Sequence, residues 1–286
     1  MHDGFFLSVI ESISIFRIAK NYPFGRMPNR AGDIAGEEVY FRAENFSPAF
    51  EGGNRMAKPD RQKLLDLFKD LRVADVRDGM DWNMMHGFGS MGRDMRPLWR
   101  TRVVGIARTY RYVPYTGPQP SVKPEEYGEW VSWYYKEVCT FPWEKEPEEG
   151  DIIVIEQTSP TGAIVGSNNS LQAIKRGARG FVVANGAVRD TDELILQKVP
   201  VWCQAITQDM VQARIQFDAK QVPVSVGGVR VCPGDIIVAD GDGVIVVPQE
   251  KALEVAKYAS QELRNDKAAR RRLYEEIGME LDDSVL

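Results

Sequence analysis

Residues 162–190 read GAIVGSNNSLQAIKRGARGFVVANGAVRD, and this stretch decides the fold class. We predict a glycine-containing loop at 161–167, a helix at 168–177 that a glycine ends, and a buried strand at 180–184. A further strand, DIIVIE at 151–156, comes before the loop. A strand, a helix and a second strand in this order are typical of α/β proteins, so we predict a layered α/β domain.

The segments on both sides continue the alternation of helices and strands. Leu64, Leu65, Phe68 and Leu71 recur at helical spacing, which predicts an amphipathic helix over residues 60–72. The other predicted helices cover residues 73–81, 191–197 and 249–277, and the other predicted strands cover residues 103–112, 199–205, 222–226, 234–239 and 243–247. Regular structure therefore dominates the chain from residue 60 onward.

Two parts of the chain depart from this pattern. Residues 1–55 have no sustained period and many prolines and glycines, so we interpret them as an N-terminal extension and residues 56–286 as one domain. Within that domain, residues 113–150 form an insert rich in proline, aromatic residues and glutamate. Nucleic-acid bases stack on aromatic side chains, but the acidic character of the insert opposes that use. We favour a packed lid or a contact between subunits.

The composition argues against several classes of protein. The formal net charge of −5 offers no basic face to nucleic acid or to an anionic membrane, and no apolar run approaches the roughly 18 residues of a membrane helix. The short apolar stretch near the N-terminus lacks the cationic leader of a signal peptide. Three widely spaced cysteines, Cys139, Cys203 and Cys232, indicate reduced thiols. We therefore expect a cytoplasmic protein with no nucleic-acid or membrane partner.

Histidine is scarce, and this restricts the possible chemistry. The chain has two histidines, His2 and His86. A Ser-His-Asp triad, a Cys-His dyad or a histidine-rich zinc site would therefore depend on His86. Carboxylates, arginines, backbone amides and water must carry most of any reaction.

Ligands of open α/β sheets bind beyond the carboxyl ends of the strands, and segment 162–169 is the first candidate. It leads into a helix whose first amides and dipole favour an anion. Ser167 or Asn168 is equally suited to be an ordinary helix cap. Both interpretations stay open from the residues alone.

Segment 185–190, NGAVRD, is the second candidate, and we interpret it as a turn after the buried strand. Asp190 offers a hard oxygen ligand to Mg²⁺, and Arg189 offers a bidentate clamp to a carboxylate. The alternative is a surface salt bridge in which Asp190 caps the following helix. An isolated Arg-Asp pair does not decide between these two.

Four segments considered together are more specific. They are the stretch at 162–190, TDELILQKVPV at 191–201, VPVSVGGVRVCPGD at 222–235 and IIVADGDGVIVVP at 236–248. In this order they resemble the RraA-like family, which includes metal-dependent 4-hydroxy-4-methyl-2-oxoglutarate and 4-carboxy-4-hydroxy-2-oxoadipate aldolases. The resemblance implies an α-β-β-α sandwich with a swivelling β/β/α core. It also implies a homotrimer or a hexamer of such subunits, with sites between them.

The resemblance also implies roles for individual residues. Arg189 corresponds to the arginine that holds the pyruvyl carboxylate and the enolate oxygen. Asp190 corresponds to the direct ligand of Mg²⁺ or Mn²⁺, and Glu193 occupies an acidic position three residues further on that we assign to the metal. Gly166 and Ser167 lie in the loop whose backbone amides receive the substrate carboxylate.

Three further positions complete the implied site. Family aldolases carry an acidic residue at the position of Asn168, which can hold a water and bind substrate but supplies no charge. Asn185 stands where aspartate is frequent. Glu262, on the last helix, corresponds to an acidic residue that reaches a water on the metal from the next subunit. We expect Asn168 and Glu262 to assist catalysis at a site with less acidic character.

The implied activity is that of a divalent-metal-dependent lyase, either an aldolase or an oxaloacetate decarboxylase, acting on a small 2-oxo acid through a stabilised enolate. Two alternatives stay open. One is a lyase or hydratase that acts on sugar acids, and the other is a non-catalytic regulator that binds ribonuclease E. The presence of Asp190 and Glu193 favours an enzyme. The methyltransferase label common for such sequences has no support, because no glycine-rich nucleotide loop follows the first strand.

Overall fold

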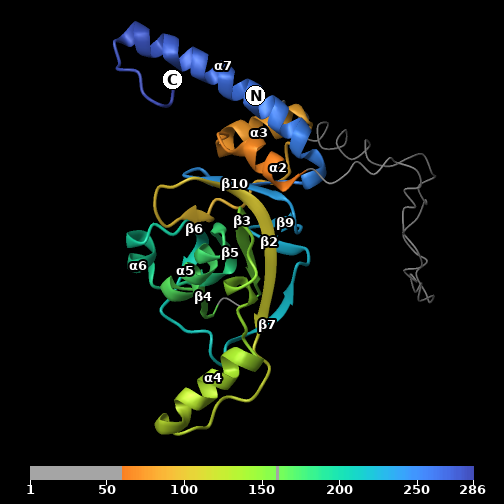
Figure 1. The fold of residues 1–286 in the computed structure, drawn as a ribbon, viewed down its shortest axis with the longest axis vertical. Helices are drawn as coiled ribbons and strands as arrows, with labels where there is room; N and C mark the ends of the chain where they lie inside the picture. Colours follow the sequence, from red (N-terminus) through yellow and green to blue (C-terminus); the bar gives the residue numbers. More distant parts are fainter. Residues whose placement is uncertain (1–59, 159–160) are drawn as a thin grey trace, which may run out of the picture. The chain divides into compact units, whose positions relative to one another are not determined.

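The computed structural model describes residues 60–158 and 161–286. The predicted extension at 1–55 lies outside the described residues. The described chain forms a mixed sheet of nine strands with helices packed against it, and a separate two-stranded sheet (Figure 1). The predicted α/β class is confirmed.

The large sheet is nearly closed. Its strands are β1 Arg96–Pro97, β2 Val103–Pro114, β3 Asp151–Gln157, β4 Ala163–Val165, β5 Ala178–Val188, β6 Val201–Ile206, β7 Ile215–Lys220, β10 Ile236–Asp240 and β11 Gly243–Val247. The main path runs β1-β6-β5-β3-β2-β10-β11, with β4 paired to β5 and β7 paired to β2. The central pairs from β2 to β6 are parallel, and β10 and β11 are antiparallel. The two end strands, β1 and β11, contact each other.

Both faces of the sheet are covered, because side chains alternate along each strand. Ile152 and Val154 of β3 belong to a core that includes the small sheet of β8 (Val224–Val226) and β9 (Val229–Val231). Ile153 and Ile155 belong to a second core on the opposite face, which the insert helps to cover. This double coverage explains why the parallel strands are almost continuously apolar.

Three helices form a third core against β2, β10 and β11 (Figure 1). They are α2 Arg61–Phe68, α3 Val73–Trp82 and α7 Ala252–Ile277. Gly79 lets α3 approach α7 closely, because an added Cβ would lie 2.6 Å from the Val255 carbonyl oxygen. Although α7 has 26 residues, none of the described helices is both long and apolar enough to cross a membrane.

The insert is folded onto the domain. It contains α4 Tyr127–Glu137 and two 3₁₀ turns, Pro124–Glu126 and Pro142–Glu144. Trp143 is fully buried, and its indole N–H donates to Tyr112 Oη at 2.9 Å. Tyr134, also fully buried, donates from its hydroxyl to the Val211 carbonyl at 2.9 Å. These anchors fix the insert beside the segment that precedes β7.

Two predicted loops are wrong in part, because some of their residues lie in strands. Residues 185–188 belong to β5, and Ala163–Val165 forms β4, which pairs with the end of β5. Asn-Gly at 185–186 is a frequent turn sequence, but here the left-handed Asn185 (φ 59°) lies in a bulge, and pairing with β6 resumes at Ala187. Neighbouring strands supply these pairings, so the local sequence does not show them.

The other predicted helices and strands are present with shifted ends. The short strands β1 and β9 and the half-exposed strand β7 have no counterpart among the predictions. The cysteines are all free; Cys139 and Cys203 are buried and Cys232 is partly exposed. The predicted reduced state of the thiols therefore fits the structure.

Candidate metal and oxo-acid site

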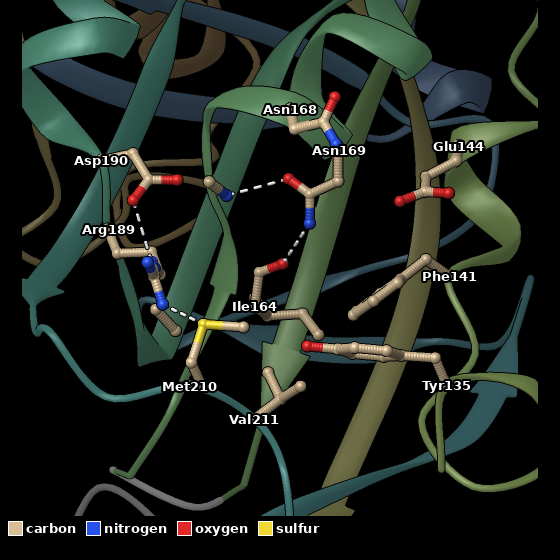
Figure 2. Close-up of a pocket in the computed structure, with 12 residues that line it drawn as sticks. Tyr135, Phe141, Glu144, Ile164, Asn168, Asn169, Arg189, Asp190, Met210 and Val211 are labelled. Carbon is tan, nitrogen blue, oxygen red and sulfur yellow. Dashed lines mark hydrogen bonds and ion pairs between the residues drawn. The ribbon is translucent and has the colours of Figure 1, made fainter. Parts of the chain in front are cut away.

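A pocket of about 410 Å³ lies where the end of β5, the start of α5 (Ser167–Lys175) and the insert meet. Figure 2 shows Arg189 and Asp190 on one side of it, and Tyr135, Phe141 and Glu144 on the other. Of the predicted site residues, the structure brings together Gly166, Asn168, Arg189 and Asp190 in this pocket, and Ser167 adjoins them.

Arg189 and Asp190 form an ion pair just after β5. The Arg189 Nε–H donates to Asp190 Oδ1 at 2.9 Å, and the two side chains are 32% and 31% exposed. Asp190 precedes α6 (Thr191–Leu196) with a left-handed backbone (φ 56°), but its side chain makes no capping bond to that helix. The alternative interpretation predicted a salt bridge and a helix cap at Asp190. The salt bridge is present, but the predicted cap is wrong.

The second carboxylate oxygen of Asp190 reaches the start of α5. The Ser167 amide donates to Asp190 Oδ2 at 3.1 Å. Partial burial alone would raise the pKa of Asp190, but the hydrogen bonds from Arg189 and from the Ser167 amide outweigh burial and hold that pKa below its usual value. Asp190 is therefore an anion at neutral pH, and each of its oxygens keeps a lone pair for a ligand.

Gly166 leaves the space that this carboxylate occupies. A Cβ at position 166 would lie 2.6 Å from Asp190 Oδ2 and 3.4 Å from Arg189 Cγ. The backbone of Gly166 is extended (φ −138°), a conformation open to any residue. Glycine is therefore required here for space, and any side chain would displace Asp190.

Ser167 or Asn168 was predicted to cap α5, and this prediction is wrong. Ser167 is the first helical residue and Gly166 is the cap position. Asn169 satisfies the helix start: its Oδ1 accepts from the Gly166 amide at 2.9 Å, and its Nδ2 donates to the Ile164 carbonyl at 3.0 Å. The amides of Gly166 and Ser167, predicted to receive a substrate carboxylate, thus already have acceptors in Asn169 and Asp190.

The two asparagines that depart from the family's pattern differ in their relation to the pocket. Asn168 is exposed and lines it. Asn185 is not among its lining residues; its amide donates to Gln204 Oε1 at 2.8 Å within the bulge of β5. Asparagine tolerates the left-handed backbone at that position. Only Asn168 bears directly on the site.

Glu193 and Glu262 lie outside this pocket in a single chain. Glu193 is exposed in the first turn of α6. Glu262 lies on α7, where its Oε1 accepts from Trp82 Nε1 at 2.9 Å beside a second cavity of about 530 Å³. The family resemblance assigns Glu262 to the site of the next subunit, so its predicted role requires a second copy of the chain.

The insert supplies pocket residues that the sequence did not identify. Glu144 lines the pocket, and burial raises the pKa of its carboxyl group although the nearby Lys145 opposes the shift. Tyr135 accepts a hydrogen bond from Gln212 Nε2 at 2.7 Å, and burial raises its pKa to about 12. Because Glu144 is one of many glutamates in an acidic segment, no local signal distinguishes it.

The metal-ligating side chains of the pocket suit a divalent cation that takes some of its ligands from the substrate. Within residues 60–158 and 161–286, no three His, Cys, Asp or Glu side chains are grouped to hold a metal ion. Mg²⁺ commonly binds one or two carboxylates and takes its remaining ligands from substrate oxygens and water. Asp190, ionised and with a lone pair on each oxygen, fits a site of that kind.

Comparison with known proteins defines the class to which this fold and pocket belong. A model of the RraA-like family, described as Aldolase/RraA, matches residues 73–246. The chain therefore belongs to the RraA-like family.

Curated relatives point to an aldolase-type activity in the family. A protein of Halalkalibacterium halodurans, provisionally named a 4-hydroxy-4-methyl-2-oxoglutarate aldolase, is 34% identical over 216 residues, which cover 75% of this chain and 90% of that protein. An Arabidopsis thaliana protein, provisionally named 4-hydroxy-4-methyl-2-oxoglutarate aldolase 2, is 33% identical over 104 residues, which cover 36% of this chain and 61% of that protein.

Solved structures show the same fold. An uncharacterized protein from Pseudomonas syringae pv. tomato is 25% identical with a TM-score of 0.59, covering 80% of this chain and all of that one. Streptomyces coelicolor RraAS2, described as an unusual member of the RNase ES inhibitor RraA protein family, is 25% identical with a TM-score of 0.60 and covers 73% of this chain and 98% of that one. The predicted RraA-like sandwich is confirmed.

Proposed function

We propose that this protein is a divalent-metal-dependent lyase that cleaves a carbon–carbon bond of a small 2-oxo acid and releases pyruvate. The observation that carries the proposal is the Arg189–Asp190 ion pair, which lines a pocket together with the start of α5. An arginine beside an ionised aspartate places fixed positive charge next to a ligand for a hard cation. The names of the curated relatives support the same type of reaction.

Arg189 is the residue that binds the pyruvyl end. Its Nε–H is used by Asp190, and its Nη1 donates to Met210 Sδ, which is a weak acceptor. A substrate carboxylate is a much stronger acceptor, so it replaces Met210 at the guanidinium. Arg189 then lies where negative charge develops on the enolate oxygen, which lowers the energy of the transition state more than that of the bound substrate.

In a 4-hydroxy-2-oxo acid, the bond between C3 and C4 breaks. The electron pair of that bond forms the enolate, the C4 hydroxyl loses its proton and becomes a carbonyl group, and C3 gains a proton to give pyruvate. A divalent cation held by Asp190 would supply Lewis-acid stabilisation of the enolate. We assign the proton transfer to a water held by Asn168 and by Glu262 of a neighbouring copy.

The surface around the pocket supports assembly into a trimer or a hexamer. Leu196 on α6 is 83% exposed, and Ile206, which lines a shallow cavity together with Arg189 and Asp190, is 61% exposed. Exposed apolar side chains beside a polar site are typical of protein contacts. Light scattering on the purified chain measures the mass directly, and a monomer at micromolar concentration would rule out this part of the proposal.

We also propose that the protein acts on small molecules in a reducing compartment such as the cytoplasm. All three cysteines are free, and the net charge of −5 does not favour nucleic acid or anionic lipid.

A pyruvate-release assay tests the central proposal. The substrates are oxaloacetate, several 4-hydroxy-2-oxo acids and sugar acids, each with Mg²⁺, with Mn²⁺ and with EDTA. We expect release from at least one 2-oxo acid that depends on the cation. Turnover that persists in EDTA would contradict the metal-dependent mechanism. If no 2-oxo acid released pyruvate, the proposal that the protein is a lyase would be wrong.

A regulatory role is the second candidate, and the likeness to RraAS2 of Streptomyces favours it. A regulator of this kind binds a ribonuclease and needs no turnover. This second candidate would be supported if the Asp190→Ala variant inhibits ribonuclease E as strongly as the original chain does.

A further inference from the structure

The pocket has a single cationic side chain. Among its lining residues, all of which lie in the described part of the chain, Arg189 is the only lysine or arginine. Its Nε–H is already committed to Asp190 Oδ1 at 2.9 Å. The remaining guanidinium nitrogens suffice for one carboxylate, which in the proposed lyase is the carboxylate next to the keto group.

The wall that faces the other end of a bound 2-oxo acid is apolar and acidic. Phe141 and Val211 present hydrocarbon to the pocket, and Tyr135 lies alongside them (Figure 2). Burial of apolar surface against these side chains stabilises an alkyl or aryl group. Among the lining residues, this surface offers no cationic side chain to an anion.

Glu144 adds a negative charge to this wall. Figure 2 shows its carboxylate pointing into the pocket from the side opposite Arg189. Within residues 60–158 and 161–286, the Glu144 carboxylate takes part in no hydrogen bond or salt bridge. The adjacent Lys145 is exposed and does not line the pocket. A second substrate carboxylate at this end would meet a like charge in a partly desolvated place, which is unfavourable.

We propose that the site selects a 2-oxo monocarboxylate whose far end carries an alkyl, aryl or hydroxyl group, and that Glu144 excludes substrates with a second carboxylate there. This inference rests on the proposed function, because it takes Arg189 as the receptor of the pyruvyl carboxylate. The substrate class therefore differs from that of 4-hydroxy-4-methyl-2-oxoglutarate, which is a dicarboxylate. The polar half of the pocket performs the reaction, and the insert determines which 2-oxo acid enters.

A matched pair of substrates tests this selection. 4-Hydroxy-4-methyl-2-oxopentanoate has a methyl group where 4-hydroxy-4-methyl-2-oxoglutarate has its second carboxylate, and both release pyruvate by the same bond cleavage. With Mg²⁺ and the full chain, we expect kcat/KM to favour the monocarboxylate by about tenfold or more. The Glu144→Gln variant should bring this ratio close to one, and Glu144→Lys should invert it.

Glu129→Gln is the matched control, because Glu129 is an exposed glutamate of the same insert that does not line the pocket. It should leave the ratio unchanged. Melting temperatures of all variants close to that of the original chain show that the comparison is between folded proteins. The inference is overturned if the original chain cleaves the dicarboxylate equally well, or if Glu144→Lys leaves the ratio as it was.

A binding measurement separates this inference from the proposed reaction. If neither compound is cleaved, calorimetric titration with 2-oxopentanoate and with 2-oxoglutarate in the presence of Mg²⁺ still reports the selectivity. The inference would hold, even though the lyase proposal fails, if the original chain binds 2-oxopentanoate more tightly than 2-oxoglutarate and Glu144→Gln reduces this preference. Equal binding of the two, or binding of neither, would overturn it.

Discussion

One wall of the pocket comes from the start of α5 and the end of β5, whereas the opposite wall comes from the insert between β2 and β3. The first wall is polar and consists of backbone amides, Asn168, Arg189 and Asp190. The second is largely aromatic and contains Tyr135, Phe141 and Glu144. Both enclose the same volume, yet they offer a ligand opposite kinds of contact.

This difference fits the proposal that the polar wall carries the reaction and the aromatic wall selects the substrate. In the polar wall, Asp190 is held by the adjacent Arg189 and by the Ser167 amide, 23 residues earlier in the chain, and Gly166 leaves room for its carboxylate. The aromatic wall is held by buried anchors such as Trp143, which lies behind it in the core. Changes to the first wall should therefore alter the reaction, and changes behind the second should alter stability first.

The largest expected effect is on the polar wall. Asp190→Ala removes the carboxylate proposed to hold the cation, so cation-dependent pyruvate release should fall by roughly a thousandfold or more, the loss of several kcal/mol of transition-state stabilisation. Steady-state kinetics with a Mg²⁺ titration measures this. Asp192→Ala, a change to an exposed acid two residues further on, is the control and should leave turnover intact. Undiminished activity of Asp190→Ala would remove this carboxylate from the site.

Removing an anchor of the insert should affect stability more than any surface change. Trp143 is fully buried, so Trp143→Ala should lower the free energy of unfolding by about 3–5 kcal/mol. Trp133, on α4, is 46% exposed, and Trp133→Ala should change the same quantity by about 0.5 kcal/mol or less. Urea denaturation followed by circular dichroism compares the two. Similar losses for both would mean that the insert is not anchored through Trp143.

Arg189→Lys keeps the charge of the polar wall and removes its planar geometry. A lysine ammonium is a point charge that cannot bind a carboxylate through two parallel hydrogen bonds, so kcat/KM should fall by about a hundredfold. Cation affinity, measured by Mn²⁺ titration, should stay nearly constant because Asp190 remains. Loss of cation binding in this variant would show that Arg189 positions Asp190 more than it binds substrate.

A smaller effect should follow from crowding the polar wall. In Gly166→Ala the new Cβ would lie 2.6 Å from Asp190 Oδ2, so the carboxylate must move and cation affinity should weaken by about tenfold. Gly128 in α4 is the comparison, because a Cβ there meets nothing within 4 Å. Gly128→Ala should leave cation affinity unchanged and stabilise the helix slightly. Equal affinities in both variants would contradict the arrangement of Gly166 and Asp190.

The smallest expected effect concerns the thiols. Cys232 is partly exposed and should react first with a thiol reagent under native conditions. Cys203 should react slowly, because burial raises its pKa to about 11, and the fully buried Cys139 within the insert should react more slowly still. Mass spectrometry after timed labelling gives the order, and Cys232→Ser should remove the first modification. Early labelling of Cys139 would show that the insert opens readily.

The α/β class, most of the helices and the polar residues of one wall could be predicted from the sequence. These predictions were possible because strand and helix periodicity are local, and because Arg189 and Asp190 are adjacent in the chain. The ordered motifs at 162–190 and 222–248 also carried the family resemblance, which the family match confirmed. The proposed roles of Arg189, Asp190, Asn168 and Glu262 remain predictions.

The side chains that face this polar wall could not be predicted from the sequence, because they depend on the tertiary structure. Asn185-Gly186 continues a strand because β6 supplies its partners, and Asp190 turns to the Ser167 amide because α5 begins beside it. Glu144 enters the pocket because Trp143, next to it in the chain, is fixed in the core. These outcomes depend on contacts between segments far apart in sequence, which local periodicity does not encode. The pairing of a single cationic side chain, Arg189, with the facing carboxylate of Glu144 is therefore a property of the folded chain.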